Sequence, residues 1–167
     1  MELAVRVEPT DVPLPAVAYR WDADTDILTA SMHAPAVGEG MSGSVEVEGG
    51  DGSWLIFDVS AGRIAGVEVA VWPDVRKVAS LAPPADAAPA RVCIPARRSQ
   101  PGIAALEVET ELAADADVAE RTIHFRIGPV RRVRHVLIAR DLALDVDERE
   151  RVAGVWLLNV PPFPAES

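Results

Sequence analysis

The stretch LIFDVSAGRIAGVEVAVWP, residues 55–73, returns in altered form near the end of the chain as LALDVDERERVAGVWLLNVP, residues 142–161. Each stretch contains two largely apolar runs separated by a few turn-forming or charged residues. That pattern predicts two central strands joined by a hairpin. The recurrence predicts that this one chain contains two copies of the same β unit.

The two copies align at defined positions. Asp58 matches Asp145, and after a one-residue insertion in the second copy Gly66 matches Gly154. Two further pairs of segments match in the same order along the chain: DADTDILT (22–29) with DADVAERT (115–122), and, faintly, VRVEPT (5–10) with LEVETE (106–111). Three matches in one order favour internal duplication over chance.

Alternating apolar and polar residues indicate further strands. In SGSVEVE, Val45 and Val47 fall on one face, whereas Glu46 and Glu48 fall on the other. TIHFRIG, residues 122–128, alternates in the same way. Turn signals separate such runs about every ten residues, which is typical of antiparallel hairpins and meanders. We therefore expect about ten strands.

Helical signals are few. PDVRKVASLA predicts one or two turns of helix within residues 74–81, and the repeat makes AADADVAERT a loop. Residues 82–102 contain five prolines, which predicts an extended surface linker with at most a short edge strand at RVCI.

The predicted fold is mostly β, with two pseudo-symmetric antiparallel β-meander repeats packed as one barrel or sandwich. The first repeat covers residues 1–81, the linker 82–102 and the second repeat 103–164, and together they form one globular unit. One repeat alone would leave its apolar face exposed and would be marginally stable. Packing two repeats together buries both faces.

The chain has a net charge of −10, which argues against a nucleic-acid ligand, because phosphate binding needs a basic face. Residues 1–90 carry 5 basic and 14 acidic groups, whereas residues 91–167 carry 11 and 12. The first half is thus an acidic body. The sequence shows no secretory signal and no long apolar run, so we expect a cytoplasmic protein without membrane contact. The single Cys93 is interpreted as a small buried residue.

The segments YRWDADTDILTA (19–30) and GRIAGVEV (62–69) together resemble the bacterial domain of unknown function 2283 family. The residues that fit its pattern are Tyr19, Asp22, Asp26, Leu28, Gly62, Gly66 and Glu68. The resemblance covers about residues 17–73, implies a β-rich fold, and brings no catalytic residues. The second copy departs from the pattern, because Trp156 stands in the place of Glu68.

Motifs for metal or covalent chemistry are weak. Asp22, Asp24 and Asp26 have the spacing of a calcium loop, but Ile27 and His33 occupy the places that need glycine and glutamate. No serine lies in a nucleophile elbow, and the glycine-rich turns lack the lysine of a phosphate-binding loop. We predict neither a metal nor a cofactor.

The three histidines, His33, His124 and His135, lack close ligand spacing, although a site with carboxylates assembled by the fold stays open. His124 falls on the polar face of its strand, where exposure to solvent is the simpler interpretation.

Eight side chains are candidates for contact with a partner or ligand. Tryptophan supplies half of the eight aromatic residues and gives large contact area at low entropy cost. The arginines of RIGPVRRVRHVLIAR either pair with local acids or bind an acidic partner. The candidates are Trp21, Trp72, Trp156, Glu46, Glu48, Arg131, Arg132 and Arg134.

Two functions fit these observations. The first, which the missing catalytic motifs favour, is a non-enzymatic interaction or regulatory module whose acidic body attracts a basic protein partner or forms a homo-oligomer. The alternative is a small-molecule-binding β-barrel, or an enzyme or cyclase acting on a hydrophobic substrate in a tryptophan-lined pocket. An enclosed cavity would favour the alternative, whereas a filled core would favour the interaction module.

Overall fold

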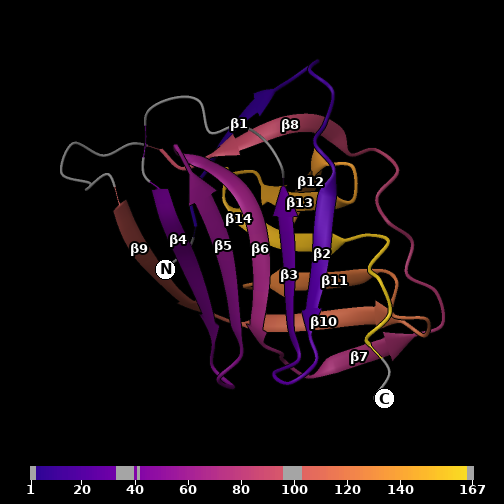
Figure 1. Ribbon diagram of the computed structural model, residues 1–167. Helices are drawn as coiled ribbons and strands as arrows, with labels where there is room; N and C mark the ends of the chain where they lie inside the picture. The colour runs from indigo at the N-terminus through magenta and orange to yellow at the C-terminus, as the bar shows by residue number, and fades with distance from the viewer. Residues whose placement is uncertain (1–2, 33–39, 41, 96–102, 165–167) are drawn as a thin grey trace.

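The computed structural model describes residues 3–32, 40, 42–95 and 103–164 (Figure 1). Within these residues the protein is all β and contains no helix. Its strands are β1 (Arg6–Pro9), β2 (Val17–Asp22), β3 (Ile27–Met32), β4 (Ser42–Gly49), β5 (Trp54–Ser60), β6 (Arg63–Val71), β7 (Val75–Val78), β8 (Ala88–Cys93), β9 (Ile103–Thr110), β10 (Leu112–Asp117), β11 (Ile123–Ile127), β12 (Val133–Ala139), β13 (Leu142–Asp147) and β14 (Val152–Leu157).

The strands form one curled mixed sheet, a half-barrel, with eleven strands on its main path in the order β7-β10-β11-β14-β13-β12-β8-β6-β5-β4-β9. Strands β3 and β2 continue from β6 on a branch, and β1 pairs with β8. Most pairs are antiparallel, but β7 with β10, β8 with β12 and β4 with β9 are parallel.

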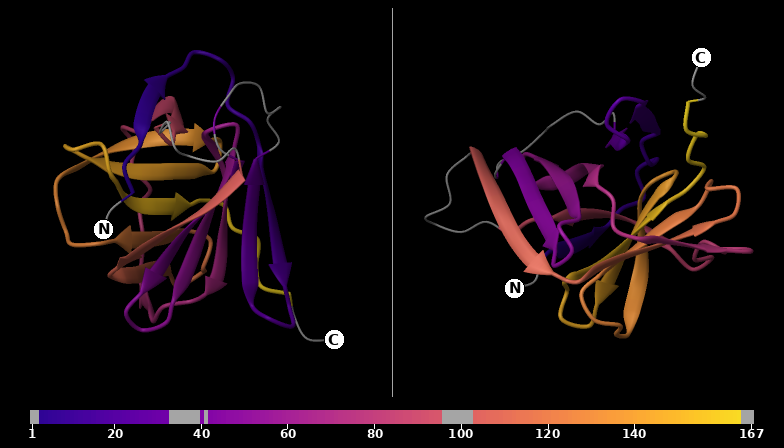
Figure 2. Two further views of the ribbon diagram at one scale, coloured as in Figure 1. Left: turned by 90° about the vertical axis from the view of Figure 1, so that its left-hand side faces the viewer. Right: turned by 90° about the horizontal axis from the view of Figure 1, so that it is seen from below.

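The curl produces two layers whose strands run across one another (Figures 1 and 2). The first layer contains β2 to β6 with β9, and the second contains β7 with β10 to β14. Strand β8 connects the layers, because it pairs with both β12 and β6. Such crossed packing is one of the two stable ways to stack sheets.

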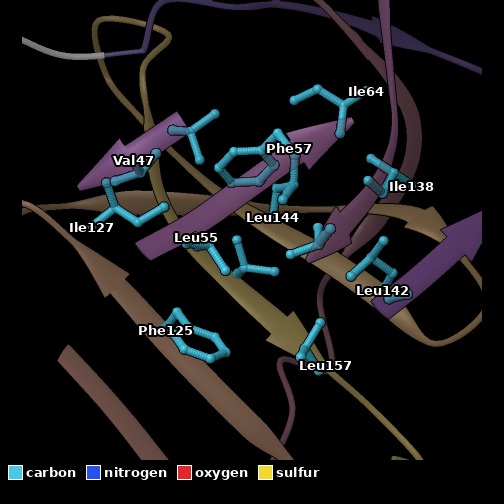
Figure 3. Packing of buried hydrophobic residues seen from close by; sticks show 14 of the residues in the cluster. Val47, Leu55, Phe57, Ile64, Phe125, Ile127, Ile138, Leu142, Leu144 and Leu157 are labelled. Atoms are coloured by element: carbon cyan, nitrogen blue, oxygen red, sulfur yellow. The ribbon is translucent and has the colours of Figure 1, made fainter. Parts of the chain in front are cut away.

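Apolar side chains from both layers fill the space between them (Figure 3). Phe57 of the first layer and Phe125 of the second are both fully buried. Val45 and Val47 lie in this core, so the alternation predicted for β4 is confirmed. The two layers therefore share one apolar core.

Three local predictions were wrong. Residues 74–81 contain the strand β7 and no helix, because Val75–Val78 pairs with β10. The segment AADADVAERT, which was predicted to form a loop, begins within β10. This strand pairs with β7 on one side and with β11 on the other. The part of the chain that the structure describes already has fourteen strands, whereas about ten were expected. In each case pairing with a distant strand overrides a weak local propensity.

The linker also differs from its prediction. Residues 88–93, which include all but the last residue of the suggested RVCI strand, form β8 inside the sheet and not at an edge. Val92 is 1% exposed, so this part of the segment lies in the core and not on the surface.

The two hairpins predicted from the repeated stretch are present. Ser60 pairs with Arg63 across a two-residue turn in which Ala61 and Gly62 have φ of 48° and 79°. In the second hairpin Asp147 N donates to Arg151 O, which leaves three residues in the loop, and Glu150 has φ of 56°. The positive φ predicted for Gly62 and the longer second loop are thus confirmed, since a three-residue hairpin needs only one left-handed position.

Candidate functional site

Four glutamates lie side by side at the end of the first layer, and we call them the acidic edge. In the parallel pair of β4 and β9, Glu46 is directly opposite Glu107, and Glu48 is directly opposite Glu109. The valines between them point into the core, so the carboxylates share the face turned away from it. Like charges directly opposite each other destabilise a sheet, so this arrangement costs stability.

The acidic edge is not neutralised within the described residues. None of its four carboxylates forms an ion pair there, although other surface acids do. Trp54 of β5 is directly opposite Glu48 on the same face, and 38% of its surface is exposed. Sequence analysis did not select Trp54, because only the strand register brings it beside the glutamates. An exposed indole beside unneutralised charge is a composition typical of binding surfaces.

The acidic edge continues into an open depression of about 670 Å³. The residues that line the depression are Glu48, Gly49, Gly50, Glu109, Thr110, Glu111 and Pro129. Three of them are glutamates and none is aromatic, so this hollow is not the tryptophan-lined pocket that the alternative function requires.

Two candidate tryptophans lie together at the other end of the first layer. The rings of Trp21 and Trp72 stack with centroids 5.7 Å apart and an interplanar angle of 17°. Trp72 also contacts Phe125 of the core, with centroids 5.6 Å apart. Both indoles are partly buried against the core cluster, and so they cover its end.

Trp156 lies apart from them. It is 8% exposed and stacks on His124, with centroids 4.1 Å apart. Because Leu157 belongs to the core cluster, the neighbouring Trp156 lies on the opposite face of β14. The three candidate tryptophans therefore do not line one common site.

The three candidate arginines are paired with local acids. Arg131 donates to Asp147 through Nε, at 2.7 Å, and to the carbonyl oxygens of Ile127 and Pro129. Arg131 is thus a structural residue of the β11–β12 turn. The other two form exposed ion pairs, Arg132 with Glu148 at 3.9 Å and Arg134 with Glu150 at 3.3 Å.

A cluster that sequence analysis missed surrounds Asp145 in the second layer. The carboxylate is 4% exposed and contacts His124 Nε2 at 2.7 Å and His135 Nδ1 at 2.6 Å. The indole Nε1 of Trp156 donates to the same carboxylate at 3.0 Å. His124 is therefore held by a buried acid, which corrects its interpretation as a solvent-exposed side chain.

The electrostatics of the cluster favour the ionised acid. Burial raises the pKa of Asp145, but hydrogen bonds and charge from His124 and His135 outweigh burial, so the pKa lies below its usual value. Gly154, directly opposite Asp145, leaves the room that this contact needs. A Cβ at Gly154 would lie 2.5 Å from Asp145 Oδ2 and 3.0 Å from His124 Nε2.

The cluster connects four strands, because its members come from β11, β12, β13 and β14. A carboxylate that orients an imidazole is also the arrangement used in general-base catalysis. Here the hydrogen bonds run among the cluster's own members. We therefore interpret the cluster as a support of the second layer.

The described residues contain no group of three or more histidines, cysteines, aspartates or glutamates placed to hold a metal ion. In the segment whose aspartates have the spacing of a calcium loop, Asp24 N donates to Asp22 Oδ1, which is a local turn contact. Cys93 is buried, and burial raises the pKa of its thiol. His33 lies outside the described residues.

Comparison with known proteins finds no family model and no curated protein that matches this chain. The resemblance to the domain of unknown function 2283 family therefore stays a prediction. Among the described residues there is also no helix of the length and apolar character needed to span a bilayer.

Proposed function

We propose that the protein is a non-enzymatic interaction module that binds a basic protein partner through its acidic edge. The observation that supports this function most is the direct opposition of Glu46 with Glu107 and of Glu48 with Glu109. A partner that places cations between these carboxylates removes their repulsion on binding. The exposed Trp54 beside them supplies apolar contact area.

The position of the acidic edge in the sheet supports the same function. Strand β9 ends the sheet order, and β4 is its only partner among the described strands. A free strand edge can accept a further strand through main-chain hydrogen bonds. Glu107 and Glu109 alternate with Val108, so a partner strand with alternating basic residues would match their spacing.

The test is the association rate with a synthetic peptide of alternating lysine and threonine, measured at low and at physiological salt. We expect the rate to fall as salt rises, because charges are screened beyond about 8 Å at physiological ionic strength. The double variant Glu46→Gln with Glu48→Gln should associate several-fold more slowly than the unmodified protein and remain folded.

A matched control exists on the second layer. Glu148 and Glu150 are also exposed glutamates two residues apart, but each is paired with an arginine. Glu148→Gln with Glu150→Gln should leave the association rate nearly unchanged. Equal losses in both double variants would show that net charge alone attracts the peptide, and the proposed site would be wrong.

We also infer that the two layers descend from one duplicated five-strand unit. The neighbour order β2-β3-β6-β5-β4 recurs as β10-β11-β14-β13-β12, which supports this origin. Asp58 lies opposite Gly66, just as Asp145 lies opposite Gly154, and both hairpins shift register directly after the aspartate.

The strand pairings refine the alignment read from the sequence. In the match of DADTDILT with DADVAERT, Asp22 was aligned with Asp115. Because Asp22 and Asp117 are the last residues of β2 and β10, aligning Asp22 with Asp117 fits the strands better. The weakest match is not supported by the pairing, because β1 pairs with β8 whereas β9 pairs with β4.

A further inference from the structure

The C-terminal segment after β14 crosses the aromatic side chains of β2. Leu158 N donates to the hydroxyl of Tyr19 at 3.1 Å, and Trp21 Nε1 donates to the carbonyl oxygen of Pro161 at 2.8 Å. The ring of Phe163 meets Trp21 edge-on, with centroids 5.1 Å apart. Residues 158–164 form no strand, so these contacts differ from sheet pairing.

The surface under this segment is a fixed aromatic platform. Tyr19 and Trp21 are two residues apart on β2, so their side chains share one face. The stacked Trp72 is held in place by its own hydrogen bond from Nε1 to Asp26 O, at 2.7 Å. Burial raises the pKa of Tyr19, so its hydroxyl stays protonated and donates to Asp141 O at 2.7 Å.

The chemistry of the segment matches that platform. Its sequence is VPPFP, residues 160–164, and adjacent prolines favour the extended polyproline II conformation. Such a segment lacks most backbone donors but keeps its carbonyl acceptors. Aromatic surfaces with an indole N–H recognise it by stacking on the proline rings and donating to a carbonyl. Trp21 donates such a hydrogen bond to the carbonyl oxygen of Pro161.

We propose that Trp21 and Trp72 form a recognition surface for proline-rich segments, occupied here by the chain's own Pro161–Pro164. A proline-rich segment of a partner protein replaces this tail when it binds. The surface is separate from the acidic edge, so the proposal does not depend on the function proposed above.

The partner segment carries arginine or lysine beside its prolines. The turn between β2 and β3, next to Trp21, holds three exposed acids: Asp22, Asp24 and Asp26. No described residue of the chain's own tail beyond Pro161 is basic. A partner with a basic flank therefore gains contacts that the tail does not make.

The occupied state is weak enough to exchange. Val160 is fully buried and Val160 N donates to Arg121 O, so the chain is firmly held up to this residue. Beyond it Pro162 and Pro164 are exposed, and Phe163 is 40% exposed. Only the contacts of Pro161 and Phe163 with Trp21 need to be replaced.

The experiment compares the unmodified full chain with a tail-substituted chain. The tail-substituted chain carries Pro162→Ser, Phe163→Ser and Pro164→Ser, which weaken the tail contact and leave Val160 and Pro161 in place. The probe is a synthetic peptide LNVPPFPRRR, added to 15N-labelled protein while the indole N–H signals are followed by NMR.

We expect saturable shifts of the Trp21 and Trp72 indole signals, with about tenfold tighter binding to the tail-substituted chain, because the competing tail occupies the surface most of the time in the unmodified chain. Trp21→Phe in the substituted chain should abolish binding, whereas Trp54→Phe, an exposed indole elsewhere, should leave it unchanged. A peptide with alanine at every proline should not bind.

Three results would overturn the proposal: no indole shift in the tail-substituted chain, equal binding of the alanine peptide, or equal binding after Trp21→Phe. A melting curve of Trp21→Phe that matches its parent excludes unfolding as the cause of lost binding. Glu46→Gln with Glu48→Gln should not change the binding of this peptide, which separates this surface from the acidic edge.

Discussion

Asp58 and Asp145 occupy comparable places in the two layers, yet their surroundings are opposite. Each aspartate follows an apolar run on the first strand of its hairpin, and each lies opposite a glycine on the second strand. Asp145 is 4% exposed and contacts two histidines and an indole. Asp58 is exposed, but its neighbours remove part of the water around its carboxyl and raise its pKa, whereas the pKa of Asp145 is lowered.

The residues across the neighbouring strands explain the difference. Asp145 lies opposite His135 on β12, whereas Asp58 lies opposite Ser44 on β4. Trp156 and His124 pair with each other in the second layer. The equivalent pair in the first layer is Glu68 and Thr29.

The two layers therefore share a strand order but differ in the face that is turned away from the core. That face is buried, or closed, in the second layer and partly exposed, or open, in the first layer. All residues of β13 and β14 are buried, whereas β5 and β6 retain exposed and half-buried positions. The side chains proposed to contact partners, namely the acidic edge, Trp54 and Trp21 with Trp72, belong mainly to the open first layer.

The largest difference is expected when each aspartate is removed. Asp145→Ala should lower the free energy of unfolding by about 3 kcal/mol, because the buried indole of Trp156 and two part-buried histidines lose their hydrogen-bond partner. Asp58→Ala should change it by less than about 0.5 kcal/mol, as is usual for an exposed side chain. Urea unfolding at neutral pH measures both values.

The pH dependence of these variants has a defined sign. The lowered pKa of Asp145 stabilises the folded state above about pH 4, the ordinary range of an aspartate, and this contribution is lost as the pH falls through the folded-state pKa. The penalty of Asp145→Ala should therefore shrink in acid. A penalty that is constant from pH 7 to pH 3 would show that packing, not charge, makes Asp145 important.

A smaller difference is expected at the two glycines. A Cβ at Gly154 would lie 2.7 Å from Phe125 O and would also displace the held carboxylate, whereas at Gly66 it would lie 2.8 Å from Ala30 O and 3.3 Å from the freer Asp58. Gly154→Ala should cost about 2 kcal/mol and Gly66→Ala about 1 kcal/mol.

A double-mutant cycle sharpens this comparison. In the Asp145→Ala background the cost of Gly154→Ala should fall toward that of Gly66→Ala, because the carboxylate no longer occupies the space. Additive costs would mean that the backbone carbonyl alone excludes a side chain at Gly154.

The smallest single effects are expected at the two hairpins, and they have opposite signs. Gly62→Val should destabilise the protein by about 1 kcal/mol or more, because valine does not tolerate φ of 79°. Glu150→Gly should have the opposite sign and stabilise the second hairpin by up to about 1 kcal/mol, because glycine adopts φ of 56° without strain. Thermal melting of both variants tests the pair, and equal signs would contradict it.

The sequence was informative where one strand carried its own signal. Alternation predicted the buried faces of β4 and β11, and the apolar runs of the recurring stretch predicted both hairpins. The strand β7 was missed, since Val75–Val78 has few β-forming neighbours and gains its conformation from β10. Local propensity carries no information about such a partner.

The site residues were harder to predict, because each site depends on register between strands. His124 and His135 come from β11 and β12, and only the four-strand order brings both to Asp145. The acidic edge joins residues about sixty positions apart through a parallel pair that hairpin rules do not predict. The available signal was the aspartate that recurs in both stretches, which does not identify the side chains around it.

The most direct test of this account is an NMR titration of the side-chain carboxyl carbons of Asp58 and Asp145 in the intact protein. An ordinary aspartate titrates near pH 3.9. Asp145 should titrate below that pH, and Asp58 should titrate above it. If Asp145 instead titrates at or above the pH of Asp58, the two layers do not hold their aspartates in opposite environments, and the contrast between a closed second layer and an open first layer is wrong.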